Sequence, residues 1–256
     1  MFLQKIFNRK ISRKVPEVIV LFWVIKLLTT AMGESTSDFM VHRFDPIIAV
    51  IIGFIGFAIA IVIQFWARKY VAWIYWLAVT MVAVFGTMAA DVVHIGLGVP
   101  YLVSTICFAI ALTIIFFVWY RVEKTLSIHS ITTPRREFFY WLTVITTFAL
   151  GTATGDMTAV TLNLGYLVSG ILFAVLFAIP LIAQKAFKVN EVITFWAAYI
   201  VTRPFGASFA DWFGRTKDLG GIGFGTGRTS IVLTIIIILL VGYLTVSNTN
   251  KNNSII

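Results

Sequence analysis

Long, unbroken runs of apolar residues dominate this sequence, and short polar stretches separate them. Eight runs of about 20 residues can be traced, at 17–38, 46–66, 71–92, 100–120, 138–157, 165–184, 191–212 and 229–247. A helix of this length crosses the ~30 Å hydrocarbon layer of a bilayer. Membrane strands form closed barrels in which polar and apolar residues alternate, whereas these runs are continuously apolar. The pattern therefore predicts an all-α polytopic membrane protein with eight transmembrane helices.

A repeated motif divides the eight helices into four pairs. Each copy has an aromatic residue followed by Trp, a Gly ten residues after the Trp and an Asp fifteen residues after it. The copies are FWVIKLLTTAMGESTSD at 22–38 and its equivalents at 75–91, 140–156 and 195–211. Because each unit has an even number of spans, the four motif helices run in the same direction. We predict four parallel two-helix repeats in a pseudo-fourfold (2+2) arrangement about the membrane normal.

The polar segments define the expected domain organisation. The order is a basic cytoplasmic tail at 1–15, repeats 1 and 2 at 16–121, a cytoplasmic connector at 122–137, repeats 3 and 4 at 138–247 and a cytoplasmic tail at 248–256. The connector contains the one extended polar stretch between motif copies, and it joins the two halves of the chain.

The composition supports a membrane protein, with 59% hydrophobic and 12% charged residues. A net charge of +9 would suggest nucleic acid in a soluble protein, but here 14 Lys and Arg residues fall in the tails and loops of one side and four on the other. By the positive-inside rule both termini are cytoplasmic. The expected partner is the lipid bilayer, with no nucleic acid. Cys107 is alone, which excludes an intrachain disulfide and a cysteine metal cluster.

The ionisable residues within the predicted helices share one helical stripe. Positions 3, 7, 11 and 15 after each motif Trp lie on one helix face. The stripe carries Lys26, Glu34, Asp38, Asp91, Asp156, Arg203 and Asp211. A charge facing the bilayer centre costs about 2.5–3.5 kcal/mol on insertion scales. We therefore expect these seven side chains to face one another around a hydrated axis. The motif glycines would either let the helices approach closely or allow each helix to loosen before its Asp.

This arrangement favours a cation site. Five acids and two bases leave a charge of −3 if all are ionised. Oxygen ligands suit Mg²⁺, Ca²⁺ or Mn²⁺ better than Cu⁺ or Zn²⁺. Crowded carboxylates repel one another when all are ionised, so some can hold a proton until a cation displaces it. Proton-coupled exchange would follow.

Plainer interpretations stay open for several of these residues. The four Asp residues are alternatively helix-end caps or solvated surface carboxylates, although capping does not need Glu34 one turn deeper. The four motif Trp residues are expected to be mainly interfacial anchors. Lys26 and Arg203 are either structural partners of the acids or internal counter-charges that act as a gate. His94, three residues after Asp91, is either a metal ligand or an ordinary outer-loop histidine.

Two segments resemble catalytic motifs but fail their requirements. GGIGFGTGRTS at 220–230 has Ile222 where a phosphate loop needs its first Gly, and Arg228 in place of the Lys. TATGD at 152–156 has Ala153 in place of the first Gly of intramembrane aspartyl proteases. We therefore expect no enzyme, no catalytic residue and no cofactor.

The fourfold motif resembles a family of bacterial integral membrane proteins that are built from four tandem two-helix repeats and have no known function. The resemblance covers the chain from about 16 to 247. It implies the fold and a bacterial inner-membrane location. It implies no catalytic or binding residues, so the functional prediction depends on the charges.

The leading prediction is a secondary transporter for a cation, with a divalent metal ion such as Mn²⁺ as the cargo. Asp38, Asp91, Asp156 and Asp211 would form an outer ring with Glu34 below it, and Lys26 and Arg203 would be internal counter-charges. One alternative is a carrier for an anion or a small organic solute that uses Lys26 and Arg203 as binding charges. Another is a non-transporting scaffold or sensor, and a homo-oligomer is compatible with each.

Overall fold

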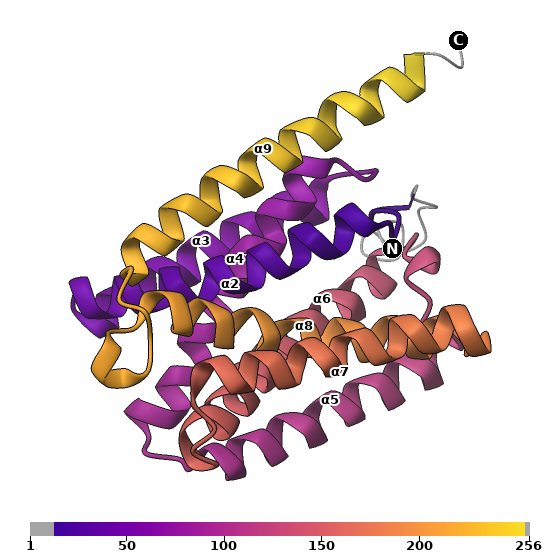
Figure 1. Ribbon diagram of the computed structural model, residues 1–256. Helices are drawn as coiled ribbons and strands as arrows, with labels where there is room; N and C mark the ends of the chain where they lie inside the picture. Colours follow the sequence, from indigo (N-terminus) through magenta and orange to yellow (C-terminus); the bar gives the residue numbers. More distant parts are fainter. Residues whose placement is uncertain (1–12, 254–256) are drawn as a thin grey trace.

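The structure is built from long helices. This computed structural model describes residues 13–253, with side chains for 13–247. In that part of the chain there are eight α-helices and no strand (Figure 1). The helices are α2 (Val20–Arg43), α3 (Pro46–Trp66), α4 (Ala72–Asp91), α5 (Tyr101–Glu123), α6 (Pro134–Asp156), α7 (Gly165–Phe187), α8 (Glu191–Gly214) and α9 (Thr226–Asn253). The all-α prediction is confirmed. Residues 1–12 and 254–256 of the predicted tails lie outside the described residues.

Six of these helices are long and apolar enough to cross a membrane. They are α3, α4 with its extension to Gly96, α5, α6 with its extension to Thr161, α7 and α9 up to Ser247. The remaining two, α2 and α8, are each 24 residues long but carry most of the buried charge of the stripe. Their side chains are buried among other helices, which explains why they can be less apolar than a helix that faces lipid. The chain is therefore a membrane protein with transmembrane helices.

Four inner helices carry the motif, and four outer helices cover them. Each inner helix packs mainly against two of the other three, so that α2 and α6 both pack against α4 and α8. Over their most apolar windows, 56% of α4 and 67% of α6 is buried, against 17–22% for the outer helices α3, α5, α7 and α9. The outer helix of each repeat packs mainly on the inner helix of the following repeat. Thus α3 packs on α4, α5 on α6, α7 on α8, and α9 returns to α2.

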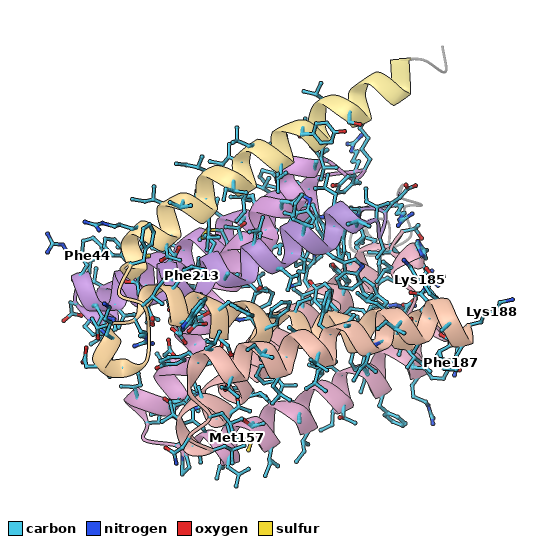
Figure 2. All side chains as sticks on the ribbon, viewed as in Figure 1. Phe44, Met157, Lys185, Phe187, Lys188 and Phe213 are labelled. Carbon is cyan, nitrogen blue, oxygen red and sulfur yellow. The ribbon has the colours of Figure 1, made fainter. Side chains whose placement is uncertain are left out.

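The inner helices all begin at one end of the molecule and finish at the other. We call these the Trp end and the Asp end, after the motif residues there. Figure 2 shows Lys185 and Lys188 at the Trp end, and Phe44, Phe213 and Met157 at the opposite end. The connector between the halves is shorter than predicted, because α6 begins at Pro134, where Thr133 caps the helix through a hydrogen bond from the Arg136 N–H.

Each motif glycine lies where two inner helices touch. A Cβ on Gly33 would collide with Ala83 of α4, one on Gly86 with Phe148 of α6, one on Gly151 with Arg203 of α8, and one on Gly206 with Thr30 of α2. In every case the contacted residue lies seven positions after the Trp of the next repeat. Of the two roles left open for these glycines, the structure supports close helix approach, and the contacts close into a ring.

Replacing Gly33 by alanine is expected to destabilise the protein by about 1–3 kcal/mol, because the added methyl group would meet the backbone of Ala83 as well as its side chain. The control is Gly242→Ala in α9, where no atom lies within 4 Å of the new Cβ. That change should be neutral or stabilising by about 0.5–1 kcal/mol. Thermal unfolding in detergent measures both, and an unchanged Gly33→Ala protein would contradict the close contact.

An aromatic layer fills the axis at the Trp end. It contains the residue before each motif Trp, namely Phe22, Tyr75, Tyr140 and Phe195. The hydroxyl oxygens of Tyr75 and Tyr140 lie 2.5 Å apart, within one hydrogen bond. Trp76, Trp141 and Trp196 are buried in the same layer. The prediction that the motif Trp residues are mainly interfacial anchors is therefore wrong for these three. They pack between inner helices because the N-terminal segment and the connector cover this end.

A buried ion pair holds those covering segments together. The Lys14 Nζ donates to Glu137 Oε2 of α6 at 2.5 Å and to the Phe65 carbonyl at 3.1 Å. The Gln64 amide donates to the other Glu137 oxygen at 2.9 Å. Both charged side chains are buried, with 3% of Lys14 and 1% of Glu137 exposed. The N-terminal segment therefore ties repeat 1 to repeat 3 at the Trp end.

Candidate functional site

Arg203 is the centre of the buried polar core. Its side chain is fully buried, and its guanidinium reaches the three other inner helices. Nη2 donates to Glu34 Oε2 at 2.6 Å, to Thr152 Oγ1 at 2.8 Å and to Thr87 Oγ1. Nη1 donates to the Thr30 carbonyl at 3.1 Å. Glu34, Thr87 and Thr152 all lie eleven residues after their motif Trp, so the predicted stripes do converge.

Lys26 does not pair with the acids. Its side chain is 1% exposed, and its Nζ has no hydrogen-bond partner among the described residues. The ammonium lies 4.0 Å from the ring centroid of Phe148 and 4.2 Å from that of Tyr199, so its contacts are cation–π. Of the two roles left open for Lys26, partner of an acid has no supporting contact among the described residues, because Arg203 pairs with Glu34.

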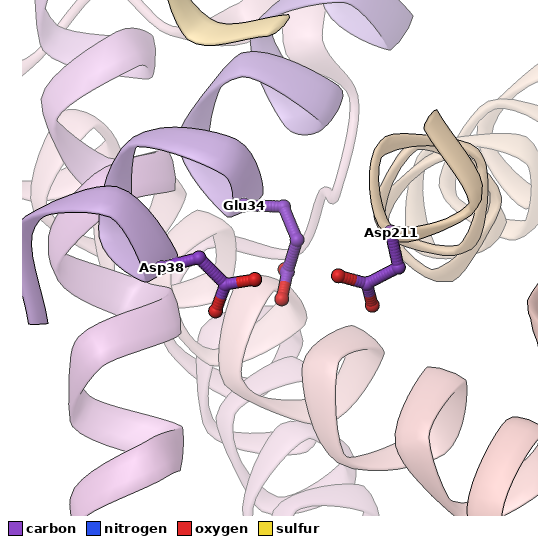
Figure 3. Close-up of side chains that lie close together, drawn as sticks. All are labelled: Glu34, Asp38 and Asp211. Atoms are coloured by element: carbon purple, nitrogen blue, oxygen red, sulfur yellow. The ribbon is translucent and has the colours of Figure 1, made fainter. Parts of the chain in front are cut away.

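Three carboxylates form a compact buried group near the Asp end. Glu34 and Asp38 of α2 and Asp211 of α8 each offer an oxygen, and these atoms lie within 4.8 Å of one another. Figure 3 shows the three side chains pointing toward a common point between the two helices. Only 7% of Asp38 and 3% of Asp211 are exposed. These residues could hold a metal ion by their oxygen ligands alone.

Asp91 and Asp156 are placed differently from the other two motif aspartates. Both are half-buried and lie outside the compact group, although their charges interact with those of Glu34 and Asp211. The helices explain the difference. π-helical turns follow Asp91 (Val92–Gly96) and Asp156 (Met157–Thr161), whereas α2 and α8 continue as α-helix beyond Asp38 and Asp211. The predicted ring of four equivalent aspartates is therefore divided into a buried pair, Asp38 and Asp211, and a half-buried pair, Asp91 and Asp156.

Arg215 is a site residue that the sequence analysis missed. Its Nη2 lies 2.9 Å from Asp38 Oδ2, and its Nε donates to Asp211 Oδ1 at 3.1 Å. The signal was present, because Arg215 lies nineteen residues after Trp196 and so continues the stripe by one more turn. With this third base, the five acids exceed the bases by two charges if all are ionised, in place of the three expected.

His94 does not join the carboxylates. Its ring packs against that of Tyr101, with centroids 4.5 Å apart and planes inclined by 46°, and its Nδ1 lies 3.1 Å from the Ser104 hydroxyl of α5. The π-helical turn that contains His94 directs it toward the start of α5. Of the two roles left open for His94, no contact among the described residues supports a metal ligand beside Asp91.

Two tyrosines lie near the half-buried aspartates Asp91 and Asp156. Tyr101 interacts electrostatically with Asp156 and Asp91, and Tyr166 interacts with Asp211 and Asp156. Each follows its own motif Asp by ten residues, so the sequence contained this signal too. Arg215, 24% of whose side chain is exposed, lies at the same end of the molecule. Toward the Trp end, Arg203, Lys26 and the aromatic layer close the axis.

The fold and the site together define a helical membrane protein with four internal repeats and a buried acidic site on its axis. The chain belongs to the family described as Repeat of Unknown Function (DUF347), whose model matches it four times in tandem, at residues 21–70, 74–125, 139–190 and 194–250. Each match contains one copy of the motif. The resemblance to a family with four tandem repeats is confirmed. Comparison with curated proteins and with solved structures gave no match.

Proposed function

We propose that the protein is a secondary transporter for a cation, with a divalent metal ion such as Mn²⁺ as its cargo. One observation carries the proposal: the oxygens of Glu34, Asp38 and Asp211 lie within 4.8 Å of one another inside a helical membrane protein. Three buried carboxylates are energetically costly in that environment, and ionisable residues inside a membrane protein generally mark a functional site. Oxygen ligands at this spacing suit a hard divalent cation, which is cargo here and not a resident cofactor.

The proposal includes a membrane orientation. All eight helices cross the bilayer as four parallel two-helix repeats, arranged with pseudo-fourfold (2+2) symmetry about the membrane normal. The Trp end, with its Lys and Arg residues, faces the cytoplasm together with both termini. The Asp end faces outward from a bacterial inner membrane. The cyclic contacts of the motif glycines support this arrangement.

The mechanism follows from the order of layers along the axis. A cation enters from the Asp end past Asp91 and Asp156 and binds Glu34, Asp38 and Asp211. Arg203 and Lys26 then oppose its further passage by charge repulsion, and the aromatic layer excludes water. Alternating access requires the inner helices to separate near Arg203. Protons that leave the carboxylates when the cation arrives would couple the two movements.

A non-transporting scaffold or sensor is the second candidate, because Arg203 and Arg215 already pair with all three carboxylates of the compact group. A carrier for an anion or organic solute has less support than either of these, because both of its proposed binding charges, Arg203 and Lys26, are already in contact with protein groups. Arg203 donates to four oxygens, and Lys26 is enclosed by two aromatic rings.

Uptake of Mn²⁺ into proteoliposomes tests the proposal. Asp38→Asn and Asp211→Asn should each reduce uptake by about tenfold or more, since each removes a direct ligand of the cation. A tenfold loss of affinity corresponds to ~1.4 kcal/mol of binding free energy. Asp91→Asn and Asp156→Asn should reduce it about two- to threefold. The control is Asp218→Asn, an exposed carboxylate at the same end. If all four folded variants took up Mn²⁺ as fast as the unmodified protein, or if the unmodified protein took up none, the result would contradict a cation path and favour the scaffold.

A further inference from the structure

Arg215 occupies the place between two helices where a shared cation would sit. It is the first residue after α8, and its guanidinium bridges Asp38 of α2 and Asp211 of α8 at 2.9 and 3.1 Å. These are two of the three carboxylates assigned to the proposed cargo cation. A cation cannot bind both while the guanidinium remains between them.

The fit of this guanidinium to Asp38 is incomplete. Asp38 Oδ2 is buried and, among the described residues, no donor reaches it with hydrogen-bond geometry, although Arg215 Nη2 lies 2.9 Å away. A buried carboxylate oxygen is normally satisfied by a well-aligned donor or a metal ion. This oxygen, although close to Arg215, can still accept a ligand.

The backbone of Arg215 is fixed, so only its side chain is free to leave. The Arg215 N–H donates to the Asp211 carbonyl at 2.8 Å, and its own carbonyl accepts from the Gly223 N–H at 2.9 Å. The loop is held further by the Ile222 N–H, which donates to the Trp212 carbonyl at 2.7 Å. The side chain is 24% exposed, which leaves a route toward solvent at the Asp end.

We propose that Arg215 is a tethered competitor for the cation site: its guanidinium bridges Asp38 and Asp211 when the site is empty, and a divalent cation displaces it. This rests on the proposed function. A divalent ion replaces one positive charge by two among the carboxylates, and therefore gains attraction from the exchange. A monovalent ion gains none. Arg215 thus selects divalent over monovalent cations.

The first test compares Arg215→Gln with the unmodified protein by Mn²⁺ titration in detergent, with free Mn²⁺ measured by electron paramagnetic resonance. Removing the competitor should tighten Mn²⁺ binding about tenfold, the scale of a lost charge-assisted contact. Na⁺ should then compete measurably, whereas with the unmodified protein we expect no competition. The matched control is Lys217→Gln, two residues further along the same loop, where the removed charge is exposed and forms no ion pair among the described side chains.

The second test needs no variant. Modification of arginine by phenylglyoxal, followed by mass spectrometry, should increase at Arg215 by about threefold or more when Mn²⁺ saturates the site, because displacement exposes the guanidinium. Arg228, in the same outer region, serves as the internal reference.

The outcomes separate this inference from the function on which it rests. Mn²⁺ binding that weakens or stays constant in folded Arg215→Gln would overturn the inference and leave the transporter intact. Unchanged Arg215 modification on saturation would do the same. Absence of Mn²⁺ binding in every protein would overturn the proposed function and the inference together.

Discussion

Replacing Arg203 by methionine is expected to lower the free energy of unfolding by about 3–5 kcal/mol, the scale for removing one partner of a buried ion pair. The loss falls mainly on Glu34, whose carboxylate would stay buried without its guanidinium. Thr87 and Thr152 keep hydrogen bonds to the carbonyls of Ala83 and Phe148, so they lose less. Thermal unfolding in detergent, followed by circular dichroism, measures the change.

A second variant identifies the cause of this loss. Glu34→Gln combined with Arg203→Met removes both charges of the pair and should recover more than half of the lost stability, because neither member of the pair is left buried without its partner. If the double variant were as unstable as Arg203→Met alone, the cost would come from packing around the guanidinium and not from the unpaired carboxylate. Such a result would show that the Arg203–Glu34 ion pair is not the main source of stability in the polar core.

Replacing Glu137 by glutamine is expected to destabilise the protein by about 3 kcal/mol, since it leaves the Lys14 ammonium buried with neutral acceptors and no carboxylate partner. The effect should be smaller than for Arg203, because Gln64 can hydrogen-bond to the new amide. The same thermal measurement applies. Because this pair ties repeat 1 to repeat 3, the variant should also become more sensitive to protease at the connector.

The matched control is Glu191→Gln. Glu191 pairs with His129 at 3.0 Å, but 62% of the Glu191 side chain is exposed. An exposed pair of this kind contributes about 0–1 kcal/mol. Equal effects at Glu137 and Glu191 would mean that burial of the Lys14 pair does not contribute to closing the Trp end.

The motif spacing predicted much of the fold and part of the site. A constant interval from Trp to Gly to Asp requires equivalent residues at equivalent heights on equivalent helices, so Glu34, Thr87 and Thr152 could be expected at one level. The structure brings these three together around Arg203. The close approach at the motif glycines followed from the same reasoning.

Pairing between charges could not be predicted in the same way. The stripe places Lys26 and Arg203 on facing helices, but which base reaches Glu34 depends on side-chain length and on helix rotation. The guanidinium of Arg203 reaches across the axis, and Lys26 remains between Phe148 and Tyr199. Arg215 was missed because the stripe was considered only as far as the motif Asp.

The sequence by itself determined that this is an all-helical membrane protein with four tandem repeats, because hydropathy and a fixed spacing are local properties of the chain. It also determined which helix faces carry the charges. Only the tertiary structure decided that each outer helix packs on the next repeat, that Asp38 and Asp211 separate from Asp91 and Asp156, and that three of the four motif tryptophans are buried. Those outcomes depend on contacts between segments far apart in the chain and on two π-helical turns. A motif whose spacing is the same in all four copies contains no information that distinguishes one repeat from another.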